Sequence, residues 1–304
     1  MQIALDNFKK FNKIKLFIKK YGWCYIFIAM PVLQFLVFTI YPLISAFLMS
    51  FQKYNVMNSK WVGLENYKYI LHRPLFVKAL VNTLIYTIGT VPVNVLISLG
   101  LALLLFPLSK RIQTFFKACF YLPAVASGVT ISLVWYVIYD PTPEGLLNKF
   151  LALFGIPNIN WLGKENIALF SLMLMTYLGG HGSGVILYLA ALGSIPSTFY
   201  EVADIDGASG WAKFLNITWP LLKPTTLYML VVGTIGAAQS FMQAYLLTSG
   251  GPNHATTTIG YLIYKDAFEY FDFGLAAAES FVLALLIAGL SIIQFKYMSS
   301  DVEY

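Results

Sequence analysis

One polar stretch between long apolar segments, residues 196–220, reads PSTFYEVADIDGASGWAKFLNITWP. Thr198 and Glu201 have the spacing of a capping box, which predicts a helix that begins at this point. Gly207 predicts the end of that helix, because glycine adopts a positive φ without strain. A second helix is predicted to follow and to end at Pro220, since proline cannot continue a helix. The stretch therefore predicts a rigid helix–turn–helix protrusion, which suits a mechanical contact with another protein.

On both sides of this protrusion the chain is dominated by apolar segments. Of its 304 residues, 58% are hydrophobic and 11% are charged, whereas a soluble domain carries about a quarter charged residues. A helix of about 20 apolar residues crosses the hydrocarbon core of a bilayer. The predicted spans are 23–51, 77–106, 115–138, 167–192, 226–247 and 273–297. The sequence thus predicts an all-α polytopic membrane protein with six transmembrane helices, because an open strand cannot satisfy its backbone in lipid.

Basic residues set the predicted orientation of the chain in the membrane. The net charge of +6 is explained by this orientation signal and does not indicate a nucleic-acid partner. Six lysines precede the first span: Lys9, Lys10, Lys13, Lys15, Lys19 and Lys20. Such a cluster favours the cytoplasmic side, and the first span usually dominates orientation, although further basic residues lie at 53–78. The predicted division is a cytoplasmic tail 1–22, a first span 23–51, an extracytoplasmic loop 52–76, a core 77–297 that contains the cytoplasmic loop 194–224, and a cytoplasmic tail 298–304.

The protrusion also matches a known motif in register. The EAA motif of ABC importer permeases reads Glu-Ala-Ala, three residues, Gly, nine residues, Ile, one residue and Leu-Pro. It is matched by Glu201, Ala203, Gly207, Ile217 and Pro220, while Val202 and Trp219 depart from it. Further similar segments are 63–67, 82–84, 122–123, 145–148, 247–252 and 256–258. The chain therefore resembles the carbohydrate-uptake (MalF/UgpA-like) family of ABC importer permeases, the inner-membrane components of binding-protein-dependent transport.

This resemblance implies a type I ABC importer permease with the MetI-like fold, located in the bacterial inner membrane. It implies that a sugar or oligosaccharide is moved into the cytoplasm by alternating access. The implied partners are a second, MalG-like permease that completes a heterodimer, two ATPase subunits and an extracytoplasmic sugar-binding protein. The coupling helix that meets an ATPase subunit is implied to involve Glu201, Val202, Ala203, Asp204, Asp206, Gly207, Ala208 and Pro220.

The chain itself is expected to bind no nucleotide, cofactor or metal. It contains no Walker A sequence of the form GxxxxGK[ST], so we expect ATP and Mg²⁺ on the partner ATPase subunits and no enzyme activity in this chain. Cys24 and Cys119 lack nearby Cys or His residues at metal-ligand spacing.

Two glutamines and two aromatic residues of the predicted fifth span are candidates for the substrate path. Gln239 and Gln243 are four residues apart and would share one helix face, with Phe241 and Tyr245 close by. Amides pair with sugar hydroxyls, and aromatic rings stack on the apolar faces of sugar rings. The alternative is that the two amides form hydrogen bonds between helices.

Glu279, Asn94 and His181 are the other polar residues of interest within predicted spans. One prediction for Glu279 is that it accepts hydrogen bonds from sugar hydroxyls or forms a contact of the transport gate. The alternative is that it lies near the outer interface and pairs with Lys265 or a similar cation. Asn94 is predicted to join helices by hydrogen bonds, and His181, among glycines, to be a packing residue.

Two other classes of protein remain as alternatives. A stand-alone secondary transporter or channel should carry buried coupling charges or an inverted repeat, and no repeat is evident. A membrane enzyme should cluster a nucleophile, a base or a metal set, but His72, His181 and His254 fall on different segments.

Overall fold

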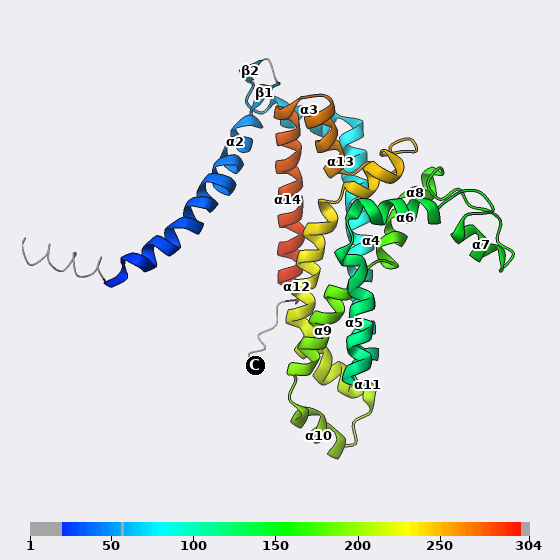
Figure 1. Ribbon diagram of the computed structural model, residues 1–304. Coiled ribbons are helices and arrows are strands. Elements are labelled where there is room, and N and C mark those ends of the chain that lie inside the picture. The colour runs from blue at the N-terminus through cyan, green and yellow to red at the C-terminus, as the bar shows by residue number, and fades with distance from the viewer. Residues whose placement is uncertain (1–19, 56–57, 299–304) are drawn as a thin grey trace, which may run out of the picture.

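The computed structural model describes residues 20–55 and 58–298, which form a bundle of helices (Figure 1). Of the predicted tails, residues 1–19 and 299–304 lie outside the described residues, and five of the six lysines that precede the first span lie there too.

Four helices are long and apolar enough to cross a bilayer: Lys20–Met49, α4 (Pro74–Leu105), Gly210–Ala238 and α14 (Phe273–Met298). The first includes the π-helical turn η1 (Leu36–Ile40) and α2 (Tyr41–Met49). The third includes α11 (Gly210–Lys213), the π-helical turn η2 (Phe214–Thr218) and α12 (Trp219–Ala238).

Two further spans are each made of a bent pair of helices. These are α5 (Lys110–Val125) with α6 (Gly128–Ile138), bent by 97°, and α8 (Glu165–Tyr177) with α9 (Gly182–Ser194), bent by 47°. With each pair counted as one span, the described residues contain six spans, the number that the sequence predicts. The bounds predicted for the fifth span, 226–247, are wrong, because the helix runs from Gly210 to Ala238. Both bends lie inside segments that hydropathy alone marks as continuous.

The break in the third span follows from a helix start inside an apolar run. Ser127 has an extended backbone (φ −65°, ψ 147°), and its hydroxyl accepts a hydrogen bond from the backbone N–H of Thr130 at 3.2 Å. A serine in this position satisfies a free N–H group of a new helix, so α6 begins there in a new direction.

The two bends pack against each other through glycines. A β-carbon on Gly180 would lie 3.1 Å from Cβ of Pro123, and one on Gly182 would lie 2.5 Å from Cα of Tyr121. Only glycine lets the backbone of α9 approach α5 this closely.

The small elements lie mainly at one end of the bundle, here called the α3 end (Figure 1). There β1 (Gln52–Tyr54) pairs antiparallel with β2 (Ser59–Trp61), with Lys53 opposite Lys60. The other helices outside the spans are α3 (Glu65–His72), α7 (Leu146–Ala152), η3 (Ala244–Thr248), α13 (Ile259–Tyr264) and η4 (Lys265–Glu269). The opposite end carries α10 (Ser197–Ile205) beside α11 and is here called the α10 end (Figure 1).

Helix α4 is the centre of the bundle and contacts α8, α9, α12 and α13. In its most apolar window 39% of residues are buried, whereas none is buried in that of Lys20–Met49, which stands apart from the bundle in Figure 1. The apolar side chains of this first helix therefore face lipid or another subunit.

Candidate functional site

The α10 end carries the helix–turn–helix that the sequence predicts, but its start differs. Helix α10 begins at Ser197 after Pro196, and no side chain caps it. The capping box of Thr198 and Glu201 is therefore wrong, because Pro196 is extended (φ −58°, ψ 134°) and starts the helix before Thr198.

The turn after α10 is confirmed in detail. Gly207 has φ +69°, its N–H donates to Asp204 O at 3.1 Å, and the N–H of Ala208 donates to Ala203 O at 2.9 Å. These two bonds form a Schellman motif, in which the glycine in the left-handed region ends the helix.

The second helix does not end at Pro220, contrary to prediction. Just before it, η2 widens the helix so that the N–H of Trp219 donates to Phe214 O, five residues back. A π-helical turn relieves the clash that a proline ring makes with the carbonyl four residues earlier. The helix therefore continues to Ala238, and Pro220 lies half-buried in its course rather than on the protrusion.

The protrusion displays apolar side chains and is internally braced. Val202, Ile205 and Trp211 are 58%, 86% and 69% exposed, an unusual state for large apolar groups outside a membrane span. Lys213 forms an ion pair with Asp204, which joins α11 to α10. Of the predicted coupling residues, Glu201, Val202, Asp204, Asp206 and Gly207 are exposed, and Ala203 and Ala208 are half-buried.

A central cavity of about 350 Å³ lies between α4, the α8–α9 bend and α12. Its polar lining consists of amides, hydroxyls and one imidazole, and no Asp, Glu, Lys or Arg lines it. The main polar residues are Asn94, Ser98, His181, Ser183, Ser240 and Gln243.

Asn94 and His181 behave differently from each other in this cavity. The Oδ1 atom of Asn94 is buried without a hydrogen-bond partner among the described residues, so the predicted helix-joining bond is not formed by this oxygen. His181 Nε2 lies 2.9 Å from Tyr177 O, which agrees with a packing role, but its ring also lines the cavity.

The predicted shared face of Gln239 and Gln243 is wrong. Helix α12 ends at Ala238, so Gln239 lies at its C-cap and the chain turns before Gln243. Gln243 lines the central cavity, whereas Gln239 and Phe241 line a second, mostly apolar cavity between α12, α13 and α14. Tyr245 packs its ring 5.1 Å from that of Tyr264.

Glu279 lies at the α3 end and lines neither of these cavities. Its side chain is fully buried and pairs with Arg73 at 3.3 Å. Of the two predicted alternatives the pairing with a cation is therefore found, but Lys265 lies over the ring of Tyr270 instead.

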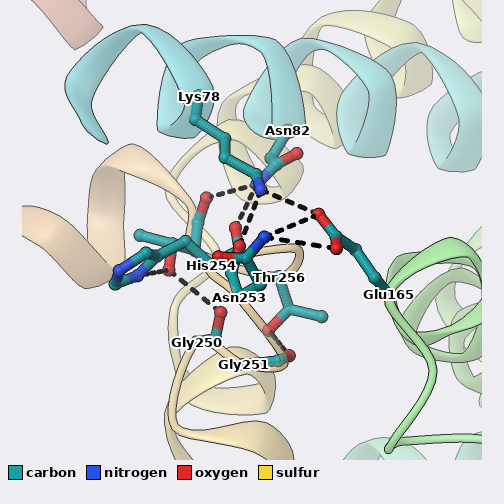
Figure 2. A network of polar contacts seen from close by, with 9 residues as sticks. Lys78, Asn82, Glu165, Gly250, Gly251, Asn253, His254 and Thr256 are labelled. Atoms are coloured by element: carbon teal, nitrogen blue, oxygen red, sulfur yellow. Dashed lines mark hydrogen bonds and ion pairs between the residues drawn. The ribbon is translucent and has the colours of Figure 1, made fainter. Parts of the chain in front are cut away.

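A polar network at the α3 end joins three segments that sequence analysis does not connect (Figure 2). Lys78 Nζ on α4 donates to Glu165 Oε1 on α8 at 2.9 Å and to Asn253 O at 2.6 Å. Asn82 Nδ2 donates to His254 O and Thr257 O at 3.0 and 2.9 Å. The segments 82–84, 247–252 and 256–258, noted above only as sequence similarities, thus meet around one loop.

These features together define a class of protein. A helical bundle with six spans, a polar cavity between its helices and a braced apolar protrusion at one end is a membrane transport component. A family model described as "Binding-protein-dependent transport system inner membrane component" matches residues 62–297. The chain belongs to this family, and is therefore a permease component of an ABC importer rather than an enzyme.

Relatives with similar sequences match almost the full length of the chain. The arabinooligosaccharides transport system permease protein AraP of Bacillus subtilis is 36% identical over 94% of this chain and 91% of its own length. The lactose transport system permease protein LacF of Rhizobium radiobacter is 33% identical over 90% of this chain and 92% of its own. The sn-glycerol-3-phosphate transport system permease protein UgpA of Pectobacterium atrosepticum is 30% identical over 92% of this chain and 95% of its own length.

A solved structure confirms the fold. The chain superposes with a TM-score of 0.78 on a chain of a bacterial ABC transporter involved in the import of the acidic polysaccharide alginate. The match covers 96% of this chain and 100% of that one at 21% identity.

Proposed function

We propose that this chain is one of two permeases of a binding-protein-dependent importer, and that it carries an uncharged sugar or oligosaccharide through its central cavity. The observation that carries this proposal is the lining of that cavity, where side-chain amides and hydroxyls converge. Among the described residues that line it there is no Asp, Glu, Lys or Arg. Such groups match the hydroxyls of a neutral saccharide, because each hydroxyl both donates and accepts.

The relatives reported above are named for both neutral and anionic substrates, so the cavity lining has to decide between them. Two of them are named for arabino-oligosaccharides and lactose, which are neutral, and one for a phosphate ester. A phosphate or uronate brought into this cavity would find no Lys or Arg among the described residues that line it, and burying an unpaired charge is costly. A neutral saccharide is therefore the better fit.

The α10 end is proposed to face the cytoplasm, with both termini on that side. In this orientation the exposed apolar protrusion is proposed to meet the ATPase subunits, and α3 and the loop of Figure 2 are proposed to face a sugar-binding protein. The exposed residues of the protrusion proposed to contact an ATPase subunit are Glu201, Val202, Asp204 and Asp206. ATP and Mg²⁺ belong to the ATPase subunits in this scheme.

Transport is proposed to use the bends that flank the cavity. The α5–α6 and α8–α9 bends contact each other through Gly180 and Gly182, so movement of one is transmitted to the other. Closure of the ATPase subunits against α10 would tilt the helix that continues from Gly210 to Ala238, which lines the cavity through Gly233 and Gly236.

Gln243→Ala is expected to lower uptake about 3- to 10-fold at low substrate concentration, the effect of one lost hydrogen bond between uncharged groups. The measurement is the initial rate of labelled sugar uptake into vesicles that contain the complete transporter. Gln239→Ala is the matched control, since this amide is exposed and lines the other cavity, and it should transport like the wild type. Equal rates for Gln243→Ala and the wild type, or equal losses in both variants, would remove the central cavity from the substrate path.

A further inference from the structure

Three charged side chains meet at the α3 end, away from the central cavity. Arg73 lies between α3 and α4, Asp266 in η4, and Glu279 in the second turn of α14. Arg73 Nη1 donates to Asp266 Oδ2 and, at 3.3 Å, to Glu279 Oε1, while Arg73 Nη2 donates to Asp266 Oδ1 at 3.3 Å. The cluster thus connects the start of the second span to the last span, across more than 190 residues of sequence.

The cluster is enclosed by apolar groups. The side chains of Asp266 and Glu279 are 2% and 0% exposed, and that of Arg73 is 17% exposed. Ile70 and Phe76 flank Arg73 in the chain and belong to the buried apolar core at this end, together with Ala278 beside Glu279. In such surroundings an unbalanced charge is far more costly than in water.

The charges in this cluster do not balance. Two carboxylates share the same Nη1 atom of one arginine, and among the described residues no second cation contacts either of them. Nearby ionisable groups add no positive charge: Tyr69 on α3 and Asp272 before α14 interact with the cluster, while Lys265 lies over the ring of Tyr270. Lys53 on β1, which packs against α14, is exposed.

One oxygen of Glu279 indicates which carboxyl group carries the proton that removes the excess negative charge. Glu279 Oε2 is buried and has no hydrogen-bond partner in the part of the chain that the structure describes, although Oε1 of the same carboxyl contacts Arg73. An ionised carboxylate with a buried, unpartnered oxygen beside a second carboxylate is a high-energy arrangement. A proton on this carboxyl removes the excess charge and turns Glu279 into a hydrogen-bond donor.

We propose that the Arg73–Asp266–Glu279 cluster is a proton-binding site, in which one proton held by Glu279 completes the contact between α3–α4 and η4–α14. With the proton bound, Arg73 and Asp266 form a balanced pair beside a neutral acid. Loss of the proton leaves a buried net negative charge, so the two carboxylates repel and the contact loosens. The stabilising effect of the bound proton is therefore lost when the proton is released.

Infrared spectroscopy of the complete transporter in lipid tests the site directly. A protonated carboxyl has a C=O stretching band that an ionised carboxylate lacks. We expect such a band at neutral pH in the wild type, its loss in Glu279→Gln, and its retention in Glu269→Gln, where an exposed acid of η4 is changed. A wild-type spectrum at neutral pH without a band that depends on Glu279 would overturn the proposal.

A second variant keeps the test decisive if Glu279→Gln fails to assemble. In Asp266→Asn one carboxylate remains opposite Arg73, so Glu279 should ionise and the band should disappear. Thermal unfolding gives an independent readout: when the pH is raised until the proton is released, the wild-type midpoint should fall by about 2–4 °C relative to Glu279→Gln. Parallel midpoints for the two proteins would show that no proton is held there. A Glu279-dependent band that persists in Asp266→Asn would show that Asp266 takes no part in holding the proton, and would overturn the cluster as the binding site.

Discussion

Gly207→Val is expected to reduce ATP-dependent uptake to background while the membrane bundle stays folded. At φ +69° a residue with a β-carbon is strained by about 1–2 kcal/mol, and a β-branched side chain is strained more. A β-carbon at this position would have no atom within 4 Å, so the effect comes from the backbone alone. Relief of the strain opens the Schellman turn and swings α10 away from α11. We expect loss of the ATPase subunits on purification in detergent, together with loss of uptake in vesicles.

Gly210→Val is the matched control for this experiment. The same substitution is made three residues further on, where a β-carbon again meets nothing within 4 Å but φ is not positive. It should retain most of the ATPase and of the uptake. If Gly207→Val keeps both at the level of Gly210→Val, the assignment of the α10 protrusion as the ATPase contact is wrong.

Gly182→Ala is expected to have the largest effect on stability. Its β-carbon would lie 2.5 and 2.6 Å from Cα and N of Tyr121, and this backbone cannot turn aside as a side chain can. Overpacking of this kind typically costs about 1–3 kcal/mol, and here it pushes α9 away from α5 at the contact between the two bends. We expect a clearly lower thermal midpoint of the purified transporter and a fall in uptake.

Gly193→Ala tests whether the effect of Gly182→Ala is local. It makes the same change in the same helix, at a glycine whose β-carbon would have no neighbour within 4 Å. Because alanine favours a helix over glycine, this variant should be as stable as the wild type or slightly more stable. A Gly182→Ala protein as stable as Gly193→Ala would contradict the close approach of α5 and α9.

Apolar length was enough to predict the number of spans, but it could not predict the bounds of the fifth span or the bends in the third and fourth. Ser127 begins a new helix within an apolar run, yet a serine inside a membrane helix often bonds to the carbonyl four residues back instead. The bend at Gly180 and Gly182 depends on contacts with Pro123 and Tyr121, almost 60 residues earlier. Hydropathy records none of these contacts.

The protrusion was predicted better than the cavity because its signals are local. The turn at Gly207 follows from one glycine and its neighbours, whereas the continuation of the helix through Pro220 depends on a π-helical turn that has no simple sequence signal. Gln239 and Gln243 are separated by a helix end, where Ser240 O accepts a hydrogen bond from Thr258 Oγ1 at 2.9 Å. That bond joins residues 18 positions apart and is invisible to helical periodicity.

Buried charges were the hardest feature to predict. The sequence indicated that Glu279 needs a partner, but a cation on a nearby segment, Lys265, was the natural expectation. The true partner, Arg73, is brought to it only by the packing of α3 against α14.

The central claim is that this chain is a permease that works only with its partners. The most direct measurement is uptake of a labelled neutral oligosaccharide into liposomes that hold the chain alone, or the chain with the second permease and the ATPase subunits, with the binding protein outside and ATP inside. We predict uptake only for the complete assembly with ATP, and none for the lone chain. Uptake by the chain alone, or uptake by the complete assembly without ATP, would contradict the account.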